Sequence, residues 1–63
     1  MIVDIEPGMV TIRDAEAILG ISNDLTLTPH QARLVAAHLE TEGEHTVAAE
    51  GLLGAADQAE KGI

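Results

Sequence analysis

Three side chains that could bind a metal recur at helical spacing in the second half of the chain. His38, Glu42 and His45 lie at i, i+4 and i+7, so an unbroken helix would place all three on one face. Imidazole nitrogens and a carboxylate are ligands that zinc accepts. Gly43 falls inside this segment and is typical of a helix end, which would separate His45 from the other two. We therefore favour solvated His and Glu side chains, with a zinc site as the alternative.

The sequence gives little support for nucleophilic or acid–base catalysis. Ser22 is the single serine, and no histidine lies close to it in the sequence. Glu40, Glu42 and Glu44 are typical of a solvated helix end, whereas general acid–base catalysis needs a positioned carboxyl with a tuned pKa. The GLLG segment at residues 51–54 lacks the spacing and the lysine of a phosphate-binding loop. We predict no catalytic residue and no cofactor, and we expect that the protein is not an enzyme.

The charge argues against nucleic acid and membranes as partners. Arg13, Arg33 and Lys61 stand against eleven carboxylates, and the net charge is -8. Such a charge repels phosphate backbones and anionic lipids. The chain has no Phe, Tyr or Trp on which an unpaired base could stack. No apolar run approaches the roughly 20 residues of a membrane span, so we expect a cytoplasmic protein.

The length of the chain limits its stability. Its 63 residues form one small domain, 1–63, and domains below roughly 70–80 residues usually need a disulfide, a metal or a partner subunit. Cysteine is absent, which excludes disulfides. Without aromatic residues the core must be built from Ile, Leu, Val, Met and Ala. We therefore expect a homodimer or a permanent protein partner.

The first residues indicate a β-hairpin. Residues 2–5 (IVDI) and 9–12 (MVTI) are rich in β-branched side chains and alternate in polarity. The Pro-Gly pair between them is a strong turn signal. We predict a hairpin over residues 1–13, with Asp4 on the solvent face and Ile2 flanking the core.

The segment after the hairpin is ambiguous. Residues 14–22 fit a short helix, with Thr11 as its cap and Gly20 as its end, but they also fit a short strand. We favour the helix. Residues 25–27 (LTL) alternate apolar and polar side chains and predict a third strand.

The clearest helix signal follows this strand. Thr28 can cap a helix, Pro29 suits its first position, and Gln31 completes a capping box. We predict a helix over residues 29–42 that ends before Gly43. Apolar residues at i, i+3, i+4 and i+7 predict one buried stripe on this helix: Ala32, Val35, Ala36 and Leu39.

A last helix is predicted over residues 46–61, with Thr46 as its cap. Gly51 and Gly54 each cost about 1 kcal/mol against Ala inside a helix. That cost is tolerable if the small-residue face allows close approach to another helix, with leucine side chains supplying the bulk. A frayed tail is the alternative.

Residues 11–22 (TIRDAEAILGIS) resemble the opening of the helix-turn-helix in MerR-type regulators and phage excisionases. In those families a Thr caps the first helix, Ala and Leu pack it, and Gly-Val/Ile-Ser forms the turn. The resemblance implies a DNA-binding regulator. In this chain, however, the strand pattern at residues 25–27 and Pro29 stand where the recognition helix should follow.

Residues 27–39 (LTPHQARLVAAHL) and 55–60 (AADQAE) are similar to small uncharacterised proteins of actinobacteria and their phages. Those proteins pair strands with a helix of the form Leu-Thr-Pro-x-x-Ala-Arg-x-Leu-Ala-x-x-Leu, followed by Ala-Ala-x-x-Ala-Glu. Here Val35 stands where Leu is usual. The resemblance implies a phage or mobile-element origin and brings no assigned activity.

Together these patterns predict a small α+β domain with an N-terminal hairpin, a third short strand and two C-terminal helices. We expect a non-catalytic, acidic interaction protein that dimerises, binds a host protein, or does both. The residues expected at the interface lie on the two helices: Leu34, Val35, His38, Leu39, Leu52 and Leu53. The alternative is a regulator, either a degenerate helix-turn-helix protein that binds DNA or an acidic competitor of nucleic acid.

Overall fold

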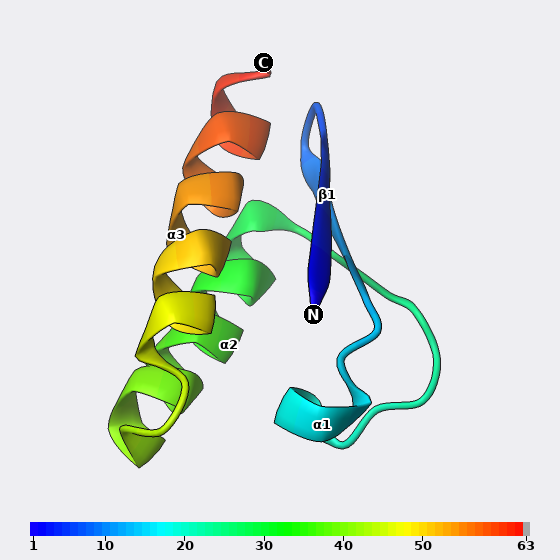
Figure 1. Cartoon of the computed structure of the whole chain (residues 1–63). Helices are drawn as coiled ribbons and strands as arrows, with labels where there is room; N and C mark the ends of the chain where they lie inside the picture. Colours follow the sequence, from blue (N-terminus) through cyan, green and yellow to red (C-terminus); the bar gives the residue numbers. More distant parts are fainter. Residues whose placement is uncertain (63) are drawn as a thin grey trace.

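The computed structural model describes residues 1–62 as a three-stranded antiparallel sheet with two helices on one of its faces (Figure 1). The elements in chain order are β1 (Ile2–Glu6), β2 (Met9–Arg13), α1 (Glu16–Leu19), β3 (Leu25–Leu27), α2 (Pro29–Glu42) and α3 (Thr46–Lys61). α3 packs against β1 and β2, and α2 packs against β2 and β3. The predicted α+β class, with a hairpin, a third strand and two C-terminal helices, is confirmed.

The register of the hairpin decides which side chains face the helices. Val3 lies opposite Ile12, and these two residues therefore share the inner face of the sheet. Asp4 lies on the outer face, as predicted, where its carboxylate pairs with Arg13 at 2.8 Å. Ile2 has the same parity as Asp4 and is 45% exposed, so the prediction that it flanks the core is wrong.

The turn of the hairpin is fastened to the end of α3. Gly8 has a φ of 79°, a left-handed conformation that glycine adopts without strain. Its N–H donates to the carbonyl oxygen of Ala59 at 2.8 Å. Ala59 belongs to the last turn of α3, and its carbonyl oxygen also accepts from the N–H of Gly62 at 3.2 Å. The bond from Gly8 ties the hairpin to the end of the helix.

α1 is a single helical turn, which settles residues 14–22 in favour of the predicted helix. It ends at Gly20, whose φ of 69° is left-handed, as predicted. Its N-cap is Ala15 and no side chain caps it, because Thr11 lies within β2. The prediction that Thr11 caps this helix is therefore wrong. β3 follows α1 where a helix-turn-helix would place its recognition helix.

α2 begins and ends as its sequence predicts. The backbone N–H of Gln31 donates to Oγ1 of Thr28 at 3.2 Å, and the N–H of Thr28 donates to Oε1 of Gln31 at 3.0 Å. This is a complete capping box, with Pro29 at the first helical position. Gly43 ends the helix with a φ of 74°.

α3 differs from its prediction at its start. Thr46 is the first helical residue, and the N-cap is His45, whose side chain makes no capping hydrogen bond. Thr46 is therefore not the cap. The helix continues to Lys61, as predicted, and not as the alternative of a frayed tail.

The core lies between the sheet and the two long helices and is built from small side chains. Among residues 1–62, twelve side chains are buried, all apolar, and seven of these are alanine. The largest fully buried residues are Ile12, Leu39, Leu52 and Val10. The predicted stripe of α2 is confirmed, with Val35 half-buried and its other three members buried.

Alanine, and not glycine, lets the helices pack closely. α3 turns Ala49, Ala55, Ala56 and Ala59 inwards. A Cβ added at Gly51 or Gly54 would meet no atom within 4 Å, so neither glycine is needed for packing inside the chain. None of the helices within residues 1–62 combines the length and the apolar character needed to cross a bilayer.

Candidate binding groove

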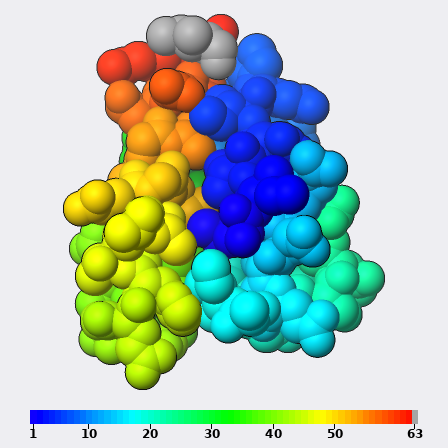
Figure 2. All heavy atoms as spheres, in the orientation of Figure 1, coloured from blue at the N-terminus to red at the C-terminus, as the bar shows by residue number. Residues whose placement is uncertain are grey.

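An open groove of about 490 Å³ lies where the beginning of the chain, α1 and the start of α3 meet. In Figure 2 these segments are the blue, cyan and yellow regions, which come together on the face shown. The residues that line the groove are Met1, Val3, Ile18, residues 44–48 and Gly51. The volume falls within the range of about 300–1,000 Å³ that is usual for ligand sites.

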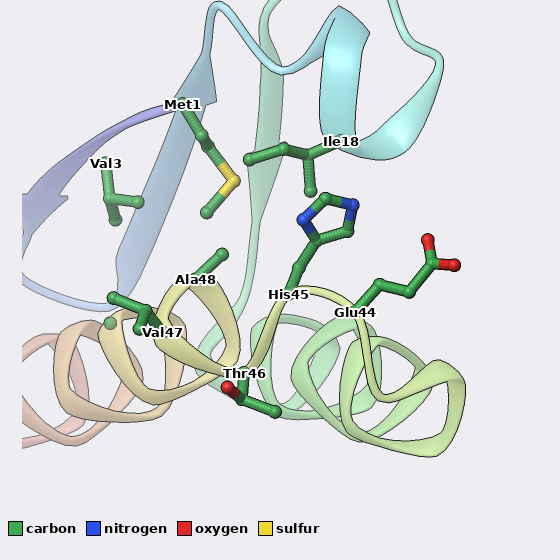
Figure 3. Close-up of a pocket in the computed structure, with 9 residues that line it drawn as sticks. Met1, Val3, Ile18, Glu44, His45, Thr46, Val47 and Ala48 are labelled. Carbon is green, nitrogen blue, oxygen red and sulfur yellow. The ribbon is translucent and has the colours of Figure 1, made fainter.

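The inner part of the groove is apolar. Figure 3 shows the side chains of Met1, Ile18 and Ala48 pointing towards one another. These three residues are half-buried, so they are accessible from the groove while also packing on the core. Val47 at the edge is 82% exposed, the largest exposure of any large apolar side chain in the described residues.

Local backbone features position each wall of the groove. The hairpin register directs Val3 to the inner face of the sheet. Gly20 ends α1 after one turn and leaves Ile18 facing the helices. Gly43 reverses the chain in a left-handed conformation, and α3 begins three residues later at Thr46. A tight connection therefore brings the uncapped start of α3 beside β1 and α1.

Two titratable side chains border the groove. Figure 3 shows the imidazole of His45 beneath Ile18, whereas the carboxylate of Glu44 extends away from the apolar side chains. His45 is half-buried and Glu44 is exposed. The groove therefore has an apolar interior and an acidic group at its mouth.

The three residues of the alternative zinc site do not come together. Nε2 of His38 lies 2.6 Å from a carboxylate oxygen of Glu42 on α2. His45 lies beyond Gly43 and lines the groove instead. Within residues 1–62, no group of three or more His, Asp or Glu side chains is placed to hold a metal ion.

The six residues predicted at an interface lie in different environments, and none of them lines the groove. Leu39 and Leu52 are 1% and 0% exposed and belong to the core, where a partner cannot reach them. The remaining residues are exposed or half-buried on the helices: Leu34, Val35, His38 and Leu53.

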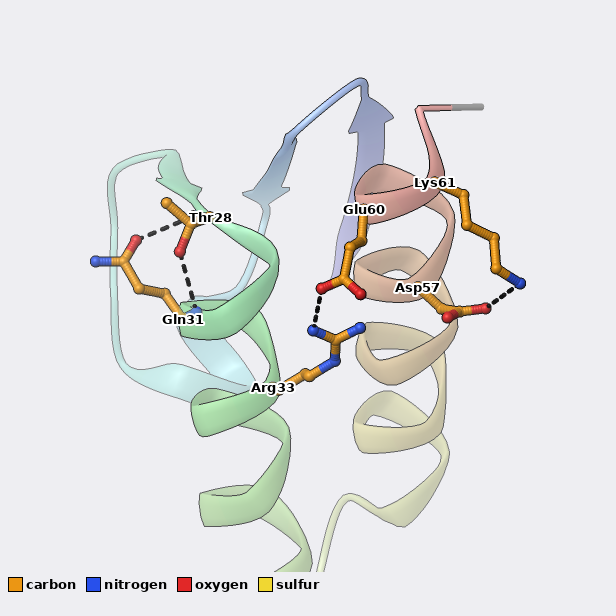
Figure 4. A network of polar contacts seen from close by, with 6 residues as sticks. All are labelled: Thr28, Gln31, Arg33, Asp57, Glu60 and Lys61. Atoms are coloured by element: carbon orange, nitrogen blue, oxygen red, sulfur yellow. Dashed lines mark hydrogen bonds and ion pairs between the residues drawn. The ribbon is translucent and has the colours of Figure 1, made fainter.

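The basic side chains are all engaged with carboxylates. Arg33 donates to Glu60 at 2.6 Å, and Nζ of Lys61 lies 3.1 Å from Asp57 (Figure 4). The hydrogen bond from Arg33 lowers the pKa of Glu60, and the same bond raises the pKa of Arg33. Arg13 pairs with Asp4 on the outer face of the sheet.

These pairs leave the remaining acidic groups without a fixed cation. Of eleven carboxylates, three are paired with Arg or Lys and eight are not, within the part of the chain that the structure describes. The eight are Glu6, Asp14, Glu16, Asp24, Glu40, Glu42, Glu44 and Glu50. The accessible charge is therefore more uniformly negative than the composition alone suggests.

Sequence patterns did not point to the groove, because three separate segments build it. Met1, Val3, Ile18 and Val47 show no common spacing, and each fits the pattern of its own strand or helix. The exposed Val47 beside a weak helix start is the one local signal that could have drawn attention to this region. No protein-family model, curated protein or solved structure matches the chain.

Proposed function

We propose that this protein is non-catalytic and acts by binding another protein chain at the groove. The observation that carries the proposal is the contiguous apolar lining of an open groove, formed by three segments, with Val47 at its edge 82% exposed. Single exposed apolar side chains are common on protein surfaces, but contiguous ones mark binding sites. The side chains of Met1, Ile18 and Ala48 converge on one cavity, so they form a contiguous apolar surface.

The small core supports the same proposal. Seven of the twelve buried side chains are alanine, which contributes little apolar area per residue. A partner that binds the folded chain adds to its stability by mass action. Filling the groove would bury Val47 and the half-buried side chains around it, which is the reinforcement that a chain of this size needs.

A matched pair of glycine variants tests the proposal. Gly51 lines the groove and Gly54 does not, yet both lie in α3 and both have open space where a Cβ would stand. Gly51→Leu would place a side chain in the groove, and Gly54→Leu would place the same side chain outside it. Leucine favours a helix over glycine by up to about 1 kcal/mol, so both variants should remain folded.

The experiment compares both variants with the unchanged protein. Sedimentation velocity over a concentration series reports self-association, and affinity capture from the native host reports a host protein. Self-association or capture that persists in Gly54→Leu and is lost in Gly51→Leu supports the proposal and says which partner is bound. A partner retained equally by Gly51→Leu contradicts it.

The charge distribution favours a second candidate, a regulator that competes with nucleic acid for a basic site. Eight carboxylates have no Lys or Arg partner within residues 1–62, and the chain is strongly acidic overall. Such a surface imitates the negative charge of a phosphate backbone. Displacement of duplex DNA from a basic host protein would support this candidate, and failure to displace it would exclude it.

A further inference from the structure

The groove lies at the most acidic end of the helix pair. Glu44 lines it directly. Glu40 and Glu42 end α2 just before Gly43, and Glu50 lies on α3 three residues after Val47. All four carboxylates are exposed, and none has a Lys or Arg partner among the described residues. Glu42 contacts Nε2 of His38 at 2.6 Å, and the other three have no such contact within residues 1–62.

The chain segment that supplies Ile18 to the opposite wall also carries two carboxylates. α1 supplies Ile18 to the lining and begins with Glu16, directly after Asp14 and Ala15. Asp14 and Glu16 are exposed and have no fixed cation within residues 1–62.

Cationic side chains lie elsewhere. Arg33 and Lys61 are held by Glu60 and Asp57 at the other end of the helix pair, as Figure 4 shows. Arg13 lies on the outer face of the sheet against Asp4. Within residues 1–62, no lysine or arginine side chain lines the groove, and the cationic group on its lining is the amino group of Met1. A partner with Lys or Arg side chains would compensate the unpaired carboxylates at this end of the helix pair.

The N-terminus of α3 also contributes a partial positive charge, which can be compared with the charges of the nearby carboxylates. A helix N-terminus is equivalent to roughly half a positive charge. Against this half charge and the amino group of Met1 stand the carboxylates of Glu40, Glu42, Glu44 and Glu50. The net charge at this end of the helix pair is therefore negative.

We infer that the groove binds a short basic and apolar segment of a partner protein. The segment places an aliphatic side chain between Met1, Ile18 and Ala48, and its Lys or Arg residues face the surrounding carboxylates. This inference depends on the proposed function and names its partner class. A second copy of the chain fits poorly, since it carries another net charge of -8 and its own cations are already paired.

Three dye-labelled peptides of equal length serve as probes: one of Lys and Leu, one of Lys and Ser, and one of Glu and Leu. Fluorescence anisotropy measures their binding to the unchanged chain, to Gly51→Leu and to Gly54→Leu. We expect the Lys/Leu peptide to bind the unchanged chain and Gly54→Leu equally, and Gly51→Leu roughly tenfold more weakly or worse. The Lys/Ser and Glu/Leu peptides should bind much more weakly, because each lacks one of the two required features.

A second pair of variants tests the charge separately from the cavity. Glu44→Gln removes a carboxylate at the mouth, and Glu6→Gln removes one at the far end of β1. Glu44→Gln should weaken binding of the Lys/Leu peptide several-fold, and Glu6→Gln should change it little. Salt of about 0.5 M should weaken binding to the unchanged chain, since it shortens the Debye length to roughly 4 Å.

The outcomes separate this inference from the proposed function. Equal binding of the Lys/Leu peptide to all three proteins would indicate attraction to net charge alone and would overturn the inference, as would equally tight binding of the Glu/Leu peptide. If Gly51→Leu loses its native partner but no basic peptide binds, the proposed function stands and the basic partner is wrong. If Gly51→Leu keeps its native partner, the proposed function itself fails.

Discussion

The start of α2 and the start of α3 lie at opposite ends of the helix pair and are built in opposite ways. At the capped end, Thr28 and Gln31 form a complete capping box, and Arg33 reaches across to Glu60. At the groove end, His45 begins α3 without a side-chain cap and Glu44 has no cation beside it.

The hairpin strengthens this contrast. Its turn is bound to the capped end through Gly8 and Ala59, while Val3 near its beginning lines the groove. Groups that satisfy one another within the chain are not available to a partner. The capped end therefore consolidates the fold, and the groove end keeps the apolar and charged groups that a partner can use.

The largest expected effect comes from the core that both ends share. Leu52→Ala should lower the free energy of unfolding by about 2–5 kcal/mol, because Leu52 is fully buried and a cavity would remain. Urea denaturation followed by far-ultraviolet circular dichroism measures this. The exposed Leu34→Ala should change stability by less than about 0.5 kcal/mol. Similar losses in both variants would show that the core is assigned wrongly.

The two helix starts can be compared directly. Thr28→Ala removes the hydroxyl that accepts from the N–H of Gln31, and should lower the free energy of unfolding by about 1 kcal/mol. Thr46→Ala should change the free energy of unfolding by no more than a few tenths of a kcal/mol, and towards greater stability, since no capping bond is lost and alanine favours the helix over threonine. Equal losses in urea denaturation would contradict the difference between the capped end and the groove end.

The glycines of α3 give a smaller effect of opposite sign. Gly51→Ala and Gly54→Ala should each raise the free energy of unfolding by about 0.5–1 kcal/mol, because both have helical surroundings and room for a methyl group. Thermal denaturation detects the gain. A loss at Gly51 alone would mean that its surroundings are tighter than the structure indicates.

The smallest effect concerns the pH dependence of the capped end. Arg33 lowers the pKa of Glu60 in the folded chain below the ordinary value of 4.5. The pair therefore contributes stability above that value, and the contribution is lost as the pH falls through the lowered pKa of Glu60. Glu60→Gln should flatten the acid side of the stability profile slightly. A profile unaltered by Glu60→Gln would show that the pair contributes nothing.

Local signals explain which parts of the fold are predictable from the sequence. The capping box at Thr28, the Pro-Gly turn and the helix ends at Gly20 and Gly43 each depend on a few neighbouring residues. Such signals do not depend on tertiary contacts. The order of strands and helices could therefore be predicted from the sequence.

The wrong predictions share a different cause. Ile2 was placed by its apolar character, although the strand period assigns it to the face of Asp4. Thr11 and Thr46 are suitable capping residues, but β2 and α3 extend to include them. The extent of a strand or helix depends on its packing against the rest of the chain, which local preference does not determine.

The groove was not predictable for the same reason. Its lining joins Val3, Ile18 and Val47 from three elements that are distant in the sequence. Leu39 and Leu52 have the stronger apolar pattern and were expected at an interface, but that pattern takes them into the core. Which apolar residues stay outside the core and line the groove depends on how the strands and helices are placed relative to one another.

The most direct test of the groove end as the binding surface is a titration of the ¹⁵N-labelled chain with the Lys/Leu peptide, followed by amide chemical shifts. The amides of Val3, Ile18, Val47 and Gly51 should move most, and those of Arg33 and Lys61 should stay in place. Largest shifts at the capped end, or at Thr11 and Thr26 on the outer face of the sheet, would contradict the assignment of binding to the groove.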